Sequence, residues 1–242
     1  MKRLFEAVTS FWLIHAFGTS IGKKLVMAIT GLALCGFLVL HLGGNLLLYV
    51  GAEEYNAYAH ALHAQKILLP IAEIGLLILF VGHIWLAIRT TFENNAARTT
   101  PYAVKQTKME EGPLAAPASS TMMITGLVVL VFLIVHLYDF ALDDHLRRLG
   151  IAKILHREPG ADLAPFERAL QILQSPVTFV VYIAGSLFLG YHLLHGFQSA
   201  FQTLGANHPK YTPIIRIVGF VFAITIAIGF ASFPFWAWAF KH

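Results

Sequence analysis

The sequence is poor in charged residues and holds one cysteine. Asp, Glu, Lys and Arg make up 12% of the 242 residues, against about 25% in soluble globular proteins. The formal net charge of +4 is too small to indicate a nucleic-acid partner. Because Cys35 is the single cysteine, an internal disulfide and a zinc site built from cysteines are excluded. These shortages predict a protein embedded in a lipid bilayer.

Long apolar runs take the place of charge. Hydrophobic residues make up 57% of the chain, and the mean hydropathy is +0.67. A helix needs about 20 apolar residues to cross the hydrocarbon core of a bilayer. Five windows are long enough, at about 25–50, 67–91, 120–142, 177–202 and 214–239. We therefore predict an all-α fold, in which residues 1–242 form a single domain of five transmembrane helices.

The segments between the windows are more polar. Residues 2–18 carry Phe5, Trp12 and Phe17, and we expect them to form an interfacial helix ahead of the first span. Residues 94–120 and the stretch between the first two spans are expected to be loops. In the loop at 143–176, the part 162–174 has apolar residues at helical spacing and could lie along the surface. No internal repeat is evident.

Lys and Arg are unevenly distributed between the two sides of this topology. Ten lie on the side that holds the N-terminus, and seven on the other. Five of those seven lie in the loop at 143–176, where acidic residues offset them. Cytoplasmic loops carry the excess of basic residues, so the N-terminus is expected in the cytoplasm and the C-terminus outside.

Histidines occupy the interior of the first four windows at two depths. Counted from the cytoplasmic end, His41 and His136 lie 16 residues into their windows, whereas His83 and His195 lie about 8 and 7 residues in. The two levels differ by about 8 residues, or ~12 Å along a helix. A buried polar side chain in a membrane calls for a ligand or a partner.

Two histidines at matching depth on different helices are what a bis-histidine haem requires. The pattern therefore predicts two stacked haems, enclosed by the first four spans, with His41 and His136 on one iron and His83 and His195 on the other. Gly43, Gly44, Gly82 and Gly196 lie beside these histidines and would leave room for a flat macrocycle. No C-x-x-C-H motif is present, so the haems would be non-covalent, b-type groups. His192 shares a helix face with His195 and competes for the same iron.

Four sequence motifs carry a family resemblance. They are "SIGKKLVMAITGLALCGFLVLHLGGNLLLY", "GHIWLAIR", "VHLYDF" and "YHLLHGFQSAFQTLG". In these motifs the chain resembles the cytochrome b membrane anchor of succinate:quinone oxidoreductases (succinate dehydrogenase or fumarate reductase), of the single-subunit, five-helix, two-haem type. The resemblance implies that His41 and His136 bind the haem distal from the cytoplasm, and that His83 and His195 bind the proximal one.

The same resemblance implies the partners and the reaction. A flavoprotein carrying FAD and an iron–sulfur subunit would dock on the cytoplasmic face, and the dicarboxylate chemistry would belong to the flavoprotein. This chain would be the electron-transfer subunit, passing electrons to or from quinone in the cytoplasmic membrane of a prokaryote. Relatives of the two-haem form more often use menaquinone. Some of them carry an acid two residues before the haem histidine of the fourth span, where this chain has Leu193.

Further polar residues are candidates for the propionate and quinone contacts. Arg89, six residues after His83, could pair with a haem propionate. Quinone reduction consumes protons, and the candidates to supply them are Glu73 and Asp139 within spans and His60 and His63 in the loop after the first span. Glu73 is equally well explained as an acid favoured by a helix N-terminus, whereas Asp139 is better explained as an acid at the end of a span.

Three other functions are consistent with buried histidines. The chain could be another di-haem transmembrane cytochrome, although such proteins would lack the first and fourth motifs quoted above. It could be a proton or metal transporter, but the last span offers few polar groups beyond Thr225 and Ser232. It could also be an anchor without haem, whose histidines only bridge helices. A redox difference spectrum separates that last possibility from the haem hypothesis.

Overall fold

The fold is helical throughout the part of the chain that the structure describes. The structure is a computed structural model and describes residues 18–97, 115–142 and 163–239; no strand occurs in these ranges. The helices are α2 (Ser20–Asn45), α3 (Leu47–Val50), α4 (Ala52–His63), α5 (Leu68–Ala96), α6 (Ala115–Leu137), the π-helix η1 (Tyr138–Leu142), α9 (Pro165–Leu173), α10 (Pro176–Thr203) and α11 (Thr212–Ala239). The interfacial helix expected at 2–18 lies outside the described residues.

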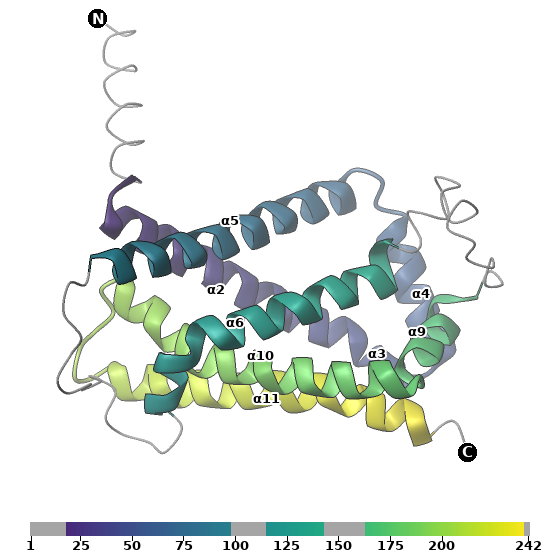
Figure 1. Ribbon diagram of the computed structural model, residues 1–242. Helices are drawn as coiled ribbons and strands as arrows, with labels where there is room; N and C mark the ends of the chain where they lie inside the picture. The colour runs from purple at the N-terminus through teal and green to yellow at the C-terminus, as the bar shows by residue number, and fades with distance from the viewer. Residues whose placement is uncertain (1–17, 98–114, 143–162, 240–242) are drawn as a thin grey trace, which may run out of the picture. The chain divides into compact units, whose positions relative to one another are not determined.

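Five segments are long and apolar enough to cross a membrane. They are Ser20–Val50, Leu68–Ala96, Thr121–Ala141, Pro176–Thr203 and Thr212–Ala239, and Figure 1 shows the long helices that form them. In a helix, the backbone N–H and C=O groups bond to one another, so they need no partners from the lipid, which offers none. The all-α fold and the five predicted windows are therefore confirmed, and the protein is a multi-pass membrane protein by the length and composition of its helices.

Two segments expected to be loops contain helix. Residues Ala52–His63 form α4, which begins with Glu53 and Glu54 in its first turn, where acidic side chains are favoured by the helix dipole. Gly51 joins α3 to α4 with a φ of 144°, a backbone conformation that other residues rarely adopt. α6 begins at Ala115, within the segment 94–120. The loop prediction is wrong at these places because hydropathy alone does not register short polar helices.

A helix does form where the apolar spacing at 162–174 predicts one, as α9 at Pro165–Leu173. Pro165 occupies its first turn, where a missing N–H costs nothing. The backbone N–H of Phe166 donates to the side-chain carbonyl of Asn56 in α4, at 2.9 Å. α9 thus packs against α4, and the two short helices lie side by side in Figure 1.

Contacts divide the chain into two compact units, which interleave along the sequence. Unit 1 comprises Met1–Phe37, Pro70–Met123 and Leu194–Phe220, and unit 2 comprises Leu38–Leu69, Ile124–Leu193 and Val221–His242. The helices α2, α6, α10 and α11 each contribute one part to unit 1 and another to unit 2.

Small residues bring helices together within each unit. In unit 2, a Cβ built on Gly190 of α10 would lie 2.5 Å from Cβ of Ala227 in α11. In unit 1, a Cβ built on Gly219 of α11 would lie 2.8 Å from the ring of Phe197 in α10. Close backbone approach at small residues is the usual way in which helices associate in membranes.

Candidate functional site

His41 and His136 meet in unit 2. His41 lies near the end of α2 and His136 near the end of α6. Their ring centroids are 5.8 Å apart, and the ring planes are 80° from parallel. The two imidazoles expected at equal depth on different helices are therefore neighbours in the folded chain.

Aromatic side chains surround this pair of imidazoles. The ring of Phe230 from α11 lies 5.5 Å from that of His41. The rings of Phe132, Phe140 and Tyr182 lie 5.3–5.9 Å from that of His136. The Nδ1 atom of His136 is buried without a hydrogen-bond partner among the described residues. An unpaired polar atom in such surroundings is costly, which marks His136 as the residue of this cluster that packing alone does not explain.

The geometry of the pair fits one metal ion between two imidazoles. Two ring nitrogens, each about 2.0 Å from a shared metal, place their ring centroids roughly 6 Å apart, and the observed separation is 5.8 Å. No group of three or more His, Cys, Asp or Glu side chains that could hold a metal ion occurs in the described ranges. A haem iron needs only two imidazoles, because the macrocycle supplies its other ligands. The separation of the two imidazoles is therefore compatible with the axial ligands of one haem iron.

An acid and a phenol lie next to His136. The hydroxyl of Tyr182 in α10 donates to the Oδ2 atom of Asp139 at 3.0 Å. The Nη2 atom of Arg168 in α9 donates to the backbone carbonyl of Asp139, also at 3.0 Å. Asp139 belongs to the π-helix η1, a conformation that is frequent at functional sites. Tyr182 was missed by the sequence analysis because a tyrosine in a span carries no distinguishing pattern of its own.

His83 is held by a threonine in unit 1. The Nδ1 atom of His83 in α5 lies 3.2 Å from the Oγ1 atom of Thr30 in α2. Next to this threonine, a Cβ built on Gly31 would lie 3.2 Å from Cε1 of the same imidazole. The ring therefore lies against the backbone of α2 at Thr30 and Gly31.

The two histidines of α10 have different surroundings. His195 belongs to unit 1 with His83, and its Nδ1 atom is buried without a hydrogen-bond partner among the described residues. No ring contact joins His195 to His83 in that part of the chain. His192 belongs to unit 2, and its Nδ1 atom lies 3.2 Å from the Oγ1 atom of Thr125 in α6. A Cβ built on Gly126 would lie 3.4 Å from Cε1 of His192.

The surroundings of His83 and His192 match because the sequence repeats itself. Residues 29–42 read "ITGLALCGFLVLHL" and residues 124–137 read "ITGLVVLVFLIVHL", identical at eight of fourteen positions. Each copy places a Thr-Gly pair against a histidine of another helix, and its last residue but one is a histidine of the His41–His136 pair. The expectation that the chain has no internal repeat is therefore wrong. The repeat was missed because the positions at which the two copies differ hold mostly different apolar residues, which are common throughout all the spans.

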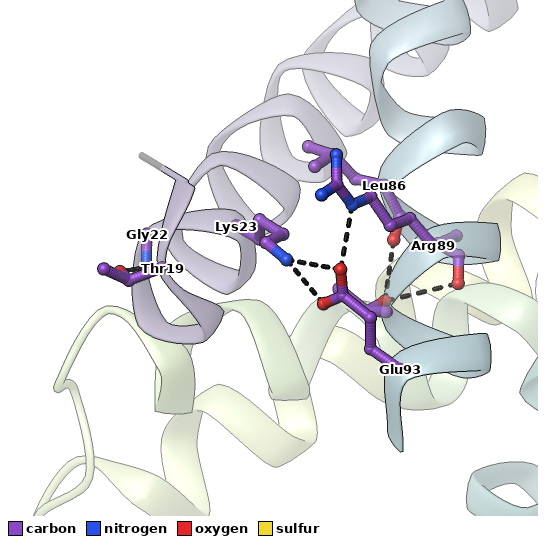
Figure 2. A network of polar contacts seen from close by, with 8 residues as sticks. Thr19, Gly22, Lys23, Leu86, Arg89 and Glu93 are labelled. Carbon is purple, nitrogen blue, oxygen red and sulfur yellow. Dashed lines mark hydrogen bonds and ion pairs between the residues drawn. The ribbon is translucent and has the colours of Figure 1, made fainter. Parts of the chain in front are cut away.

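An ion-pair network lies at the start of α2 in unit 1 (Figure 2). The Nζ atom of Lys23 lies 2.6 Å from the Oε1 atom of Glu93 in α5, and the Nε atom of Arg89 lies 2.8 Å from the same oxygen. The side chain of Lys23 is 8% exposed, against 39% for Glu93 and 49% for Arg89. The candidate propionate ligand Arg89 thus already has an acidic partner on its own helix, and its guanidinium lies over the ring of Trp85.

The remaining candidates are exposed and scattered. Glu73 is exposed near the start of α5 and belongs to unit 1, whereas Asp139, His60 and His63 belong to unit 2. His60 and His63 are exposed in the last turn of α4, so their expected place in a loop is corrected to a helix. The Nδ1 atom of His63 donates to the backbone carbonyl of Ala59 at 2.7 Å. Among the quinone candidates, Asp139 is the one that the structure places beside a histidine of the paired site.

Comparison with known proteins adds no family to this geometry. Neither a protein-family model, nor a curated protein, nor a solved structure matches the chain. The resemblance to the succinate:quinone oxidoreductase anchor thus rests on the four sequence motifs and stays a prediction.

Proposed function

We propose that the chain is a di-haem cytochrome b, the membrane subunit of a succinate dehydrogenase or fumarate reductase. It would pass electrons between an iron–sulfur subunit and a quinone in the cytoplasmic membrane of a prokaryote. The observation that carries the proposal is the 5.8 Å ring contact between His41 and His136. Two imidazoles from separate spans, at the spacing of two ligands on one metal ion, are what axial ligation of a haem needs.

The proposal assigns four imidazoles to two irons. His41 and His136 would bind one haem, and His83 with His195, which belong to the same unit, would bind the other. His192 is the rival of His195, and its contact with Thr125 supports it because ligating histidines generally donate their second ring N–H to a partner. When bound, each haem b would supply reversible one-electron transfer.

The surrounding side chains would exclude water and handle protons. Phe132, Phe140 and Phe230 pack against the His41–His136 pair and keep water from it. Asp139, with its carboxylate held by the Tyr182 hydroxyl, is the acid best placed to exchange a proton with a quinone bound near His136. The Nε atom of Arg89 donates a hydrogen bond to Glu93, which leaves its two Nη groups for a haem propionate.

The partners follow from the resemblance. A flavoprotein with FAD would carry out the dicarboxylate chemistry, and an iron–sulfur subunit would connect it to this chain. Menaquinone is the quinone that the two-haem form of the family favours. The lipid bilayer is the partner supported by the chain itself, because five helices are long and apolar enough to span it.

Haem quantitation on purified histidine variants tests the proposal. We expect two haems b per chain in the wild type, and one in each of His41→Ala, His136→Ala and His83→Ala. One of His192→Ala and His195→Ala should lose a haem, and that result assigns the ligand on α10. The control is His208→Ala, an exposed histidine that bonds a backbone N–H of its own loop and should keep both haems. A wild-type protein that is folded and free of haem would refute the proposal.

A further inference from the structure

We infer that Thr30 is a positioning residue that fixes which nitrogen of His83 presents its lone pair. The inference rests on the proposed function for its readout. It deepens that function, because it names a side chain that would set the orientation of an iron ligand without touching the iron.

The hydroxyl of Thr30 can donate one hydrogen, and its own helix takes that hydrogen. The Oγ1 atom lies 2.9 Å from the carbonyl oxygen of Val26 and 3.0 Å from that of Met27. A threonine in a helix commonly donates to these carbonyls. The lone pairs of the same oxygen then face the Nδ1 atom of His83 at 3.2 Å, so Nδ1 carries a proton and donates it to Thr30.

The proton on Nδ1 fixes the role of the other ring nitrogen. A neutral histidine has one protonated and one unprotonated ring nitrogen, and the partner of one nitrogen decides the state of the other. With Nδ1 protonated, Nε2 is left as the nitrogen that can bind a metal ion.

The glycine after each threonine belongs to the same device. A Cβ on Gly31 would lie 3.2 Å from Cε1 of His83, and a Cβ on Gly126 would lie 3.4 Å from Cε1 of His192. The absent side chain lets the imidazole lie close enough to the helix for the 3.2 Å contact with the preceding threonine. The Thr-Gly pair occurs at the same place in both copies of the repeat, so the same two residue types lie against an imidazole in each copy.

The test compares Thr30→Val with Thr30→Ser and Thr90→Val. Valine keeps the shape of threonine and removes the hydroxyl, and serine keeps the hydroxyl. Thr90 is a matched control in the same unit, because it is buried and donates to the carbonyl of Leu86 at 2.7 Å. Its hydroxyl bonds to carbonyls of its own helix and to no histidine among the described residues.

For Thr30→Val we expect one of the two haems to bind 10- to 100-fold more weakly, as is typical when the hydrogen-bond partner of a metal ligand is removed. The rate of haem transfer to apomyoglobin measures this change. The midpoint potential and the low-spin electron paramagnetic resonance signal of that haem should shift, while those of the other haem stay unchanged. Thr30→Ser should restore the wild-type values, and Thr90→Val should not depart from them. If Thr30→Val does not assemble, Thr30→Ala is assayed in the same way.

Each outcome has one meaning. A Thr30→Val protein with the potentials, signals and transfer rates of the wild type overturns the inference and leaves the proposed function intact. A wild-type protein without haem overturns the proposed function.

Discussion

Replacing Gly190 by alanine adds one methyl group where α10 meets α11 in unit 2. That group would lie 2.5 Å from Cβ of Ala227 and 3.1 Å from the backbone carbonyl oxygen of Ala223. Carbon atoms pack at about 3.5–4.0 Å, so the two helices must separate by at least about 1 Å. Neither obstacle is the end of a flexible side chain, so the backbone has to move. Overpacking of this kind costs about 1–3 kcal/mol.

Equilibrium unfolding in mixed micelles measures this loss of stability for Gly190→Ala. Gly75→Ala is the control, because Gly75 lies inside α5 and a Cβ built on it meets nothing within 4 Å. The control should be as stable as the wild type or gain up to about 1 kcal/mol from the higher helix propensity of alanine. Because Gly190 is two residues from His192, Gly190→Ala should also weaken haem retention. A Gly190→Ala protein as stable as Gly75→Ala would refute the close packing of α10 on α11.

Other substitutions test the polar contacts. Glu93→Gln should lower the thermal stability, because it leaves the buried Lys23 ammonium without its acidic partner. The double variant Lys23→Met, Glu93→Gln should recover most of the lost stability. A Glu93→Gln protein as stable as the wild type would contradict the ion pair. Tyr182→Phe should destabilise the protein by about 1 kcal/mol and slow quinone reduction, because Asp139 loses its hydroxyl partner. Tyr191→Phe is the control and should have no effect. Equal stability and equal rates in the two variants would argue against a role for Tyr182. Arg89→Gln should change stability less than Glu93→Gln, since Arg89 is half exposed and lies one turn from Glu93.

The positions of the five long helices in the sequence could be predicted from hydropathy alone. Each window contains about 20 apolar residues, and a lipid environment leaves such a run few alternatives to a helix. The meeting of His41 and His136 could also be predicted, because both lie 16 residues from the same end of their windows. Depth along a span is a quantity that the sequence carries directly.

Contacts that depend on how a helix is rotated could not be predicted in this way. Lys23 pairs with Glu93, 70 residues away, and Thr30 with His83, 53 residues away. To predict these contacts, one must know which side of each helix faces the other. Apolar spans with little amphipathic pattern do not reveal those sides. The repeat of the Thr-Gly pair was the available signal for Thr30 and Thr125. α4 was missed because it is short and polar.

The most direct test of the account is the reduced-minus-oxidised spectrum and pyridine haemochrome assay of the purified wild-type chain, expressed with sufficient iron. The account predicts b-type absorption corresponding to two haems per chain, reduced in two steps, with one haem lost in His41→Ala and in His136→Ala. A folded protein that shows no reducible b-type absorption would contradict it.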